Sequence, residues 1–288
     1  MNPLIDIIIL VHNKYRYTEF CLKGLLRTLY RPLHVILVNN GSEDRTPETL
    51  AEFRHKAESR DIRVSIITNE ANKGAVTGRN QALEKRIGEF TVFMDNDVVP
   101  VSRTWIKPMI EFLRSRPAAG AVSPKLIYPV EPFRIQCAGC DVAPTGKVNF
   151  RGRGAERRDP RFSAVLKAQA LISACMCVPS DVIENVGPFD TLFSPVQFED
   201  IDYCYRIKQE DRDLYYYPDI EMYHFENVTT SRTPALNPVY NTVKNGMKFK
   251  KKWKHVFSLE NGPDERSMEW QAIDTVDIGD IDPDMIIP

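Results

Sequence analysis

The sequence lacks the features that are typical of membrane-spanning proteins, of nucleic-acid-binding proteins and of secreted proteins. No apolar run approaches the ~20 residues that a membrane-spanning helix needs. Lysine and arginine (38) almost balance aspartate and glutamate (39), so no basic excess points to nucleic acid. The first residues lack the basic start and the cleavage site of a signal peptide. With 43% hydrophobic residues among 288, the composition predicts a globular cytoplasmic protein that does not bind nucleic acid.

Two glycine-rich phosphate-binding motifs are absent as well. No G-x-G-x-x-G follows the first apolar segment, and no G-x-x-x-x-G-K-[ST] occurs anywhere in the chain. These absences argue against a dinucleotide-dependent dehydrogenase and against a P-loop ATPase. If the protein binds a diphosphate, a cation must neutralise that diphosphate instead.

Six cysteines leave two interpretations open. Cys137 and Cys140 have the spacing of a zinc knuckle or of a redox motif, and Cys175 and Cys177 lie further on. A structural zinc site needs two such pairs on a rigid framework. In an expected strand over 171–178, Cys175 and Cys177 share one face, where thiols pack as small hydrophobes. We therefore favour reduced thiols that hold no metal.

Apolar segments and helical patterns alternate through the first part of the chain. We expect strands at 4–11, 34–38, 62–68 and 90–94. We expect helices at 18–30, from Thr46 onward, at 74–86, and at 102–114, where Ser102 would be the cap. Nearly continuous apolar runs are typical of strands that are covered on both faces. The order predicts an α/β protein with a mostly parallel central sheet and right-handed crossovers.

Each of these four strands ends in a short polar segment. The segments are His12-Asn13, Asn39 to Ser42, Asn69 to Asn72, and Asp95-Asn96-Asp97. Ligands of parallel α/β sheets bind beyond the carboxyl ends of the strands, so the segments predict a nucleotide-sized crevice. Because unpaired ionised groups are costly inside a sheet, we interpret Asp95 and Asp97 as a site for a cation and a diphosphate. The alternative is a turn in which these side chains bond only to the local backbone.

A second acidic group opens a helix that we expect to begin near Glu199. Asp202 and Arg206 form an i, i+4 pair, which places Glu199 and Asp200 at the amino end of the helix. The helix dipole stabilises acids there, and this alone would explain them. The functional alternative is that one of them projects into the crevice as a base. His224 ends an expected strand at 220–224, where it is either structural or the third ligand of a divalent ion.

The remaining segments carry weaker signals. Five arginines in 151–161 indicate a mobile, solvated loop or, alternatively, a lid that contacts an anionic ligand. Six lysines between Lys244 and Lys254 predict a basic helix that packs by its aromatic residues or meets an anionic membrane. From Glu260 onward acids dominate, which is typical of a loosely ordered tail.

Taken together in their order and spacing, seven pieces of the chain resemble a known family. They are the segments 7–13, 39–46, 72–80, 88–97, 187–190 and 199–206, and His224. The chain resembles a family 2 glycosyltransferase with the GT-A fold over about residues 4 to 230. The resemblance implies one Rossmann-like domain over residues 1–230, with a nucleotide-binding part at 1–100 and an acceptor part at 101–230. Residues 231–288 would then be an extension made of the basic helix and the acidic tail.

The resemblance also implies roles for particular residues. Asp95-Asn96-Asp97 matches the family's DxD motif, so Asp97 would hold Mn²⁺ or Mg²⁺, and Asp95 would contact the metal's water or the ribose. His224 would complete the metal shell. Asp200 would be the catalytic base, with Glu199 beside it, and the reaction would invert the sugar's configuration.

The same resemblance places the donor, a sugar linked to UDP or GDP. Val11, Asn13, Asn39 and Arg79 fall where the nucleotide sits in the family, together with Asp95 and Asn96 of the DxD motif. Family members commonly have Asp where this chain has Asn39, so the base of the donor stays open. The acceptor would be a glycan, a lipid-linked molecule or a protein, and peripheral contact with the inner face of a membrane is one alternative.

Two other functions stay open at this point. A sugar-1-phosphate nucleotidyltransferase shares an α/β nucleotide site, but no glycine-rich loop containing arginine follows the first strand. A non-catalytic protein that binds nucleotide sugars would not need both acid pairs and His224.

Overall fold

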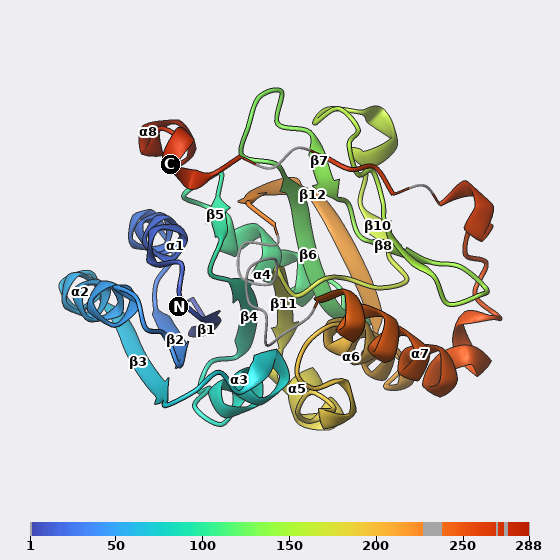
Figure 1. The fold of residues 1–288 in the computed structure, drawn as a ribbon, viewed down its shortest axis with the longest axis horizontal. Helices are drawn as coiled ribbons and strands as arrows, with labels where there is room; N and C mark the ends of the chain where they lie inside the picture. Colours follow the sequence, from blue (N-terminus) through green and yellow to red (C-terminus); the bar gives the residue numbers. More distant parts are fainter. Residues whose placement is uncertain (1, 227–237, 269, 274–275, 288) are drawn as a thin grey trace.

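In the computed structural model, one large sheet carries helices on both faces (Figure 1). The structure describes residues 2–226, 238–268, 270–273 and 276–287. The strands are β1 (Ile5–Val11), β2 (Leu33–Asn40), β3 (Ile62–Asn69), β4 (Phe90–Asp95), β5 (Val98–Pro100), β6 (Ala119–Ile127), β7 (Ile135–Cys137), β8 (Cys140–Val142), β9 (Val148–Phe150), β10 (Leu166–Lys167), β11 (Cys175–Pro179) and β12 (Asp213–His224). The α-helices are α1 (Tyr15–Arg27), α2 (Thr46–Glu58), α3 (Gly74–Leu83), α4 (Ile106–Arg114), α5 (Ser180–Val186), α6 (Glu199–Gln209), α7 (Pro238–Phe257) and α8 (Pro283–Ile286). Short 3₁₀ turns are η1 (Pro160–Phe162), η2 (Thr191–Phe193), η5 (Glu265–Ser267) and η6 (Ile278–Asp280).

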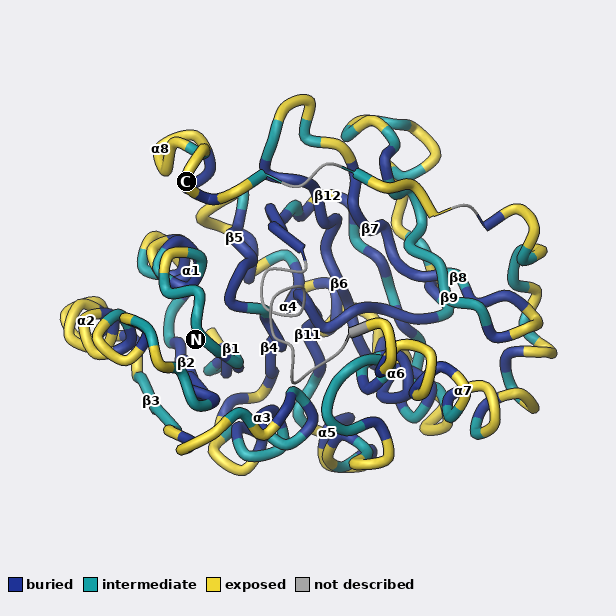
Figure 2. Tube along the Cα trace, in the orientation of Figure 1, coloured by how far each residue is buried: buried dark blue, intermediate teal, exposed yellow. Residues whose placement is uncertain are grey.

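The first half of the sheet is parallel. Strands β3, β2, β1 and β4 lie side by side in that order. Strands β1, β2 and β4 are buried along almost their whole length (Figure 2), because helices cover them on both faces. Helices α1 and α2 pack on one side of these strands and α3 on the other, as successive right-handed crossovers require. This half of the fold confirms the α/β pattern that the sequence predicts.

The second half of the sheet is mixed. β11 runs antiparallel to β4 and to β6, and β12 runs parallel to β6. The short strand β5 pairs antiparallel with the end of β12 and sets His224 opposite Val98. The sequence predicted a strand at 220–224, but β12 begins at Asp213 and continues to His224 across a bulge between Tyr217 and Glu221.

Several predicted bounds are wrong by a few residues. α1 begins at Tyr15 and not at residue 18, although its buried residues begin at Thr18, and the Asp44 carboxylate accepts a hydrogen bond from the Tyr15 N–H at its start. α4 begins at Ile106, and Ser102 is no helix cap, since its hydroxyl accepts a hydrogen bond from the Thr104 backbone instead. β11 begins at Cys175 rather than at residue 171.

All six cysteines are buried and free of disulfides. Cys175 and Cys177 lie in β11, against β4 and β6, and pack as small hydrophobes there. Burial raises the pKa of the Cys204 thiol to about 12, so that thiol stays protonated at neutral pH.

The C-terminal segment is more ordered than the sequence suggested. After α7, Glu260 accepts hydrogen bonds from Tyr205 and Lys208, at 2.8 and 2.5 Å. The chain then crosses the molecule to α1 (Figure 1), where Ile278 and Ile286 are buried beside Phe20. The prediction of a loosely ordered tail is therefore wrong for the described residues. The proposed domain boundary at 230/231 lies outside the described residues, and no described helix is long and apolar enough to cross a membrane.

Candidate active site

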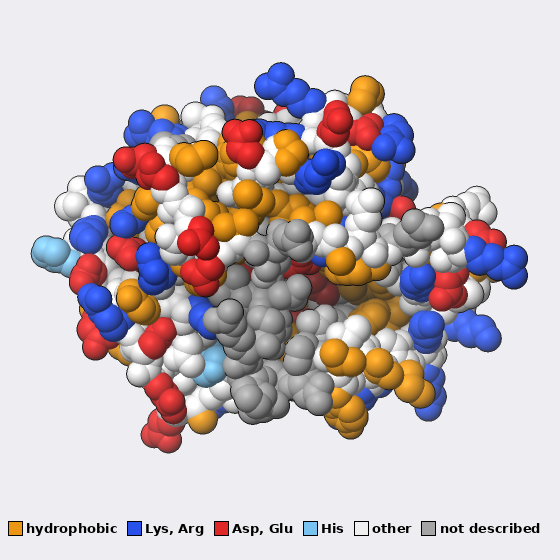
Figure 3. All heavy atoms as spheres, turned by 45° about the horizontal axis from the view of Figure 1, so that its top comes forward, with side chains coloured by type: hydrophobic (Ala, Val, Ile, Leu, Met, Phe, Trp, Pro, Cys, Tyr) orange, Lys and Arg blue, Asp and Glu red, His pale blue; other side chains and the backbone are white. Residues whose placement is uncertain are grey.

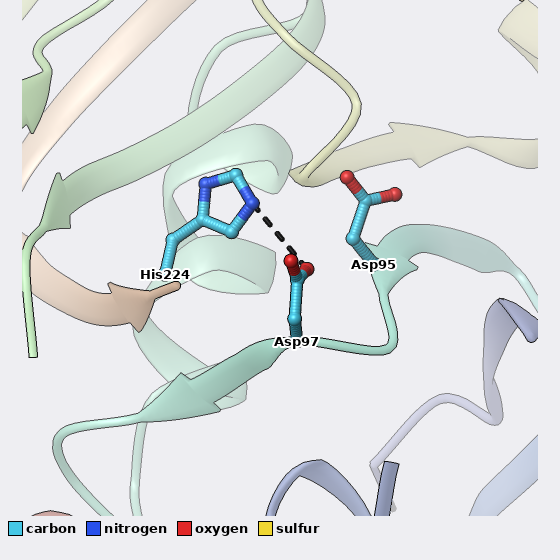
Figure 4. Close-up of side chains that lie close together, drawn as sticks. All are labelled: Asp95, Asp97 and His224. Carbon is cyan, nitrogen blue, oxygen red and sulfur yellow. Dashed lines mark ion pairs between the residues drawn. The ribbon is translucent and has the colours of Figure 1, made fainter. Parts of the chain in front are cut away.

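Three residues from separate elements meet at the end of β4. Asp95 is the last residue of β4, Asp97 follows in the turn before β5, and His224 ends β12. One ligand atom from each lies within 4.8 Å of the others (Figure 4). Among the described residues this is the one group of three His, Cys, Asp or Glu side chains arranged in this way. The pairing of β5 with β12 is what brings His224 to the two acids.

The side-chain amide of Gln136 orients the imidazole ring of His224. Its Nδ1 lies 2.7 Å from Oε1 of Gln136, and its Nε2 lies 3.4 Å from Oδ1 of Asp97. The amide oxygen can only accept, so Nδ1 carries a hydrogen and Nε2 faces the acids. Burial lowers the pKa of His224, but the carboxylates of Asp97 and Asp95 outweigh burial and raise that pKa to about 9.

This group fits a divalent cation by its chemistry. Two carboxylates and one imidazole nitrogen are the ligands that Mn²⁺ takes readily, and the carboxylates also suit Mg²⁺. Asp97 and His224 are buried, whereas Asp95 is partly exposed. The ion would therefore be held on its protein side and open to a ligand on the side of Asp95.

A buried arginine connects Asp95 to the second acidic group. Nη2 of Arg79 lies 3.0 Å from Oδ1 of Asp95, and Nη1 lies 2.7 Å from Oε1 of Glu199. The guanidinium also lies over the ring of Phe189, 5.8 Å from its centre. Arg79 comes from α3 and is only 7% exposed. The family resemblance implied that Arg79 lies beside the nucleotide. In the structure, its two terminal nitrogens bind the carboxylates of Asp95 and Glu199.

Glu199 and Asp200 have different surroundings at the start of α6. Glu199 is 4% exposed, and its Oε2 has no hydrogen-bond partner among the described residues. Burial raises the pKa of Glu199 to about 7, although Arg79 opposes this. Asp200 accepts hydrogen bonds from the backbone N–H groups of Ser173 and Ile201, at 3.2 and 2.8 Å. Burial raises the pKa of Asp200 as well, while Arg79 and these two N–H groups lower it.

A cavity of about 760 Å³ joins these groups. One end is polar and contains Asp95, Asp97, His224, Glu199, Asp200 and Arg79, together with His12, Asn40 and Asn72. The other end is mostly apolar and contains Val148, Phe150, Ile172, Phe198, Val239, Val243 and Trp270. His12, Asn40, Asn72, Asp95 and Asp97 meet at the polar end because parallel strands end at one edge of a sheet. Arg79, Glu199, Asp200 and His224 come instead from α3, α6 and β12. Five of the seven apolar residues come from β9, α7 and the C-terminal segment, whereas Ile172 and Phe198 lie in the loops before β11 and α6.

Four residues that the sequence assigned to the nucleotide have other contacts. Val11 is fully buried in β1. The side-chain oxygens of Asn13 and Asn39 accept hydrogen bonds from the backbones of Glu43 and Ser42. The side chain of Asn96 donates to Thr18, although Asn96 also borders the cavity. Asn39 borders a separate hollow of about 370 Å³ with Ser42, Glu43 and Thr68. Their sequence neighbours His12 and Asn40 also line the large cavity.

The arginine-rich segment is a loop in which three of the five arginines pair with acids elsewhere in the chain. Arg151 pairs with Asp141, Arg157 with Glu221, and Arg153 binds Glu226 through two bonds of 2.8 and 3.0 Å. The Arg153 guanidinium also stacks on Trp270, 3.9 Å from the ring centre. Three of the five arginines therefore pair with acidic side chains outside the segment, whereas Arg158 and Arg161 are exposed, as expected of a solvated loop. The lid stays a prediction.

The chain is similar to known proteins in both sequence and structure. The chain shares 28% identity over 234 residues with the uncharacterized protein y4gI of Sinorhizobium fredii, covering 79% of this chain and 25% of that protein. The chain spans about a quarter of the length of the first relatives that it matches. Among solved structures, GalNAc-T7 with UDP, GalNAc and Mn²⁺ superposes with a TM-score of 0.70 at 14% identity, covering 88% of this chain and 50% of that one.

A second solved structure has the same fold as this chain. The mannosyltransferase PcManGT from Pyrobaculum calidifontis, in complex with GDP-Man and Mn²⁺, superposes with a TM-score of 0.60 at 15% identity, covering 90% of this chain and 72% of that one. These likenesses show the GT-A fold, an α/β architecture with a mostly parallel central sheet. The family model described as "Glycosyl transferase family 2" matches residues 6–155, just over half of the chain. With the acidic turn after β4 inside that match, the chain belongs to glycosyl transferase family 2.

Proposed function

We propose that this protein is a metal-dependent, inverting glycosyltransferase that moves a sugar from a nucleotide-diphosphate sugar to an acceptor hydroxyl. One observation carries the proposal: Asp200 and the group of Asp95, Asp97 and His224 line the same cavity. A cavity of about 760 Å³ has the volume of a site for a ligand of this size.

The metal group would hold Mn²⁺ or Mg²⁺, with Asp97 and His224 as the buried ligands and Asp95 as the ligand nearest the substrate. The ion would neutralise the charge that develops on the departing diphosphate. The likeness to GalNAc-T7 with UDP and Mn²⁺, and to a mannosyltransferase with GDP-Man and Mn²⁺, supports a donor linked to UDP or GDP. Asn39 does not select between the two bases, because it borders a separate hollow and its oxygen accepts a hydrogen bond from Ser42.

Asp200 would be the general base. It would take the proton from the acceptor hydroxyl, while the acceptor oxygen attacks the anomeric carbon from the side opposite the diphosphate. One bond to the anomeric carbon forms as the bond to the diphosphate breaks, so the configuration inverts. The N–H groups of Ser173 and Ile201 fix the carboxylate in place, and burial makes it a stronger base. Glu199 would hold Arg79 rather than act on the substrate, because its Oε1 already binds the guanidinium.

The replacement Asp200→Asn tests this assignment. The variant should fold, should bind the donor with manganese as tightly as the parent protein, and should lose transfer by about 10²- to 10⁴-fold. Glu210→Gln, at the other end of the same helix, is the matched control and should keep full activity. Full transfer activity in Asp200→Asn would overturn the base assignment.

The products separate this function from its alternatives. Donor and acceptor should release a nucleoside diphosphate and a glycosylated acceptor of inverted configuration. Release of pyrophosphate would instead identify a nucleotidyltransferase, and donor binding with no product would identify a binding protein. A glycan, a lipid-linked molecule and a protein are the acceptor classes to compare.

A further inference from the structure

Helix α7 exposes apolar side chains beside the cavity. Val239, Val243 and Met247 follow one another at intervals of four residues, so they form one stripe along the helix. Their exposed fractions are 73%, 61% and 68%, and Tyr240 next to them is 58% exposed. A helix of a globular protein normally turns such a stripe toward the core. This stripe faces outward.

The opposite face of α7 is firmly packed, so the exposure does not come from a loosely attached helix. Phe249, Trp253 and Phe257 are almost completely buried. The Trp253 indole donates to Asp202 at 2.7 Å, and the buried amide of Asn245 donates to the Phe193 carbonyl at 2.8 Å. The helix therefore has a packed face and a second, exposed apolar face.

The outer face changes from apolar to basic along its length. Lys250, Lys251 and Lys254 continue the stripe toward the carboxyl end of α7, and all three are exposed. None of them forms an ion pair with a described residue. Lys252, on the packed side, pairs instead with Asp190 and Asp202. The exposed lysines thus provide positive charge that no acid of the described chain balances.

The apolar part of this face reaches the active-site cavity. Val239 and Val243 belong to the apolar end of the cavity as well as to the exposed stripe. Figure 3 shows hydrophobic side chains grouped beside basic ones in the lower right of the view, next to the hollow. A surface bound to the outer face of α7 would therefore lie at the entrance to the cavity.

We propose that the outer face of α7 docks the enzyme on an anionic phospholipid surface, with the cavity opening toward the lipid. The face is a convex helix with side chains that enter a headgroup layer, followed by lysines that bind phosphate groups. A protein groove would need a matching apolar and acidic partner, whereas an anionic bilayer supplies both chemistries over any area. If the proposed transfer is correct, a lipid-borne acceptor would enter through the apolar end of the cavity; the docking itself does not depend on transfer.

Vesicle sedimentation tests the docking, with the purified protein and no donor. The protein should bind vesicles that mix phosphatidylglycerol with phosphatidylcholine at least tenfold more tightly than vesicles of phosphatidylcholine alone. Met247→Asp should weaken that binding about tenfold or more, because the charge enters the apolar stripe. The triple variant Lys250→Gln, Lys251→Gln and Lys254→Gln should abolish the preference for the anionic lipid.

The control is a charge-matched triple variant on other surfaces, Lys23→Gln, Lys56→Gln and Lys107→Gln, which should bind like the parent protein. Unchanged vesicle binding in Met247→Asp, or equal losses in both triple variants, would overturn the proposal. So would self-association that Met247→Asp abolishes in the absence of lipid. Donor hydrolysis, measured without vesicles, should be the same in all these variants. Vesicle binding without any donor hydrolysis in the parent protein would leave the docking intact and refute the proposed transfer.

Discussion

Replacing Arg79 with Met tests whether the two acidic groups form one unit. The replacement removes both ion pairs, 3.0 Å to Asp95 and 2.7 Å to Glu199, and keeps much of the side chain's length. Glu199 would then be buried with neither oxygen paired, since Oε2 already has no partner among the described residues. Breaking a buried ion pair in this way costs about 3–5 kcal/mol. We expect Arg79→Met to lower the free energy of unfolding by that amount at pH 8.

A neighbouring arginine supplies the control. Arg86 pairs with Glu184 at 3.1 Å, but the Glu184 side chain is 65% exposed. An exposed pair contributes roughly 0–1 kcal/mol, so Arg86→Met should change stability by no more than that. Urea unfolding in metal-free buffer, followed by tryptophan fluorescence, measures both variants. Equal effects of the two replacements would refute the view that burial makes the Arg79 pairs structural.

The pH dependence gives a second check on the same variant. The pKa of Glu199 is raised from 4.5 to about 7 in the folded protein, so the folded state holds this proton more tightly than the unfolded state does. Ionising Glu199 therefore costs stability as the pH rises from about 4.5 to about 7, by roughly 3 kcal/mol in total. At pH 5 Glu199 is largely protonated with or without Arg79, whereas at pH 8 its ionisation depends on Arg79, so losing Arg79 should cost about 1 kcal/mol more at pH 8 than at pH 5. Glu199→Gln should remove most of this difference, and a cost that does not depend on pH would contradict the reasoning.

Two further predictions concern the metal group and the C-terminal segment. Gln136→Leu removes the acceptor that holds Nδ1 of His224, and should weaken Mn²⁺ binding about 10- to 100-fold by calorimetry; unchanged affinity would show that the amide does not orient the imidazole. Ile286→Ala should lower the free energy of unfolding by about 2 kcal/mol, because this side chain is 2% exposed and packs in the cluster that contains Phe20; Met285→Ala, at a 58% exposed position, is its control. A loosely ordered tail would make the two replacements equal.

The sequence predicted the parallel half of the sheet well because each element there carries its own signal. Continuous apolar runs mark β1 and β2, and Pro47 marks the start of α2. β6 lacks such a signal, since Gly120, Pro124 and Lys125 interrupt its apolar pattern. The Lys125 ammonium is buried only because the carbonyl of Arg157 and the carboxylate of Glu221 lie beside it, at 3.0 and 3.5 Å. Those partners are distant in the sequence, and no local pattern reveals them.

In the site too, features with a local sequence pattern could be predicted, whereas contacts between residues distant in the sequence could not. Asp95 and Asp97 stand in a strand-end turn, and turns after parallel strands share one edge of the sheet. The contact between Arg79 and Glu199 joins residues 120 positions apart, and Gln136 lies 88 positions from His224. Gln136, which orients His224, lies in β7 of the mixed half of the sheet. The strand order of that half cannot be predicted from hydrophobic periodicity, so neither can this contact.

The position of the site follows from the place where the two halves of the sheet meet. β4 belongs to the parallel half and supplies Asp95, whereas α6 precedes β12 of the mixed half and supplies Glu199 and Asp200. Three carboxylates in one buried region would repel one another and take up protons. Arg79 binds two of them directly and also lowers the pKa of Asp200, against the effect of burial. A carboxylate can serve as a base only if it is ionised, so one arginine on α3 both joins the halves and favours the ionised form of the proposed base, although burial leaves the pKa of Asp200 raised overall.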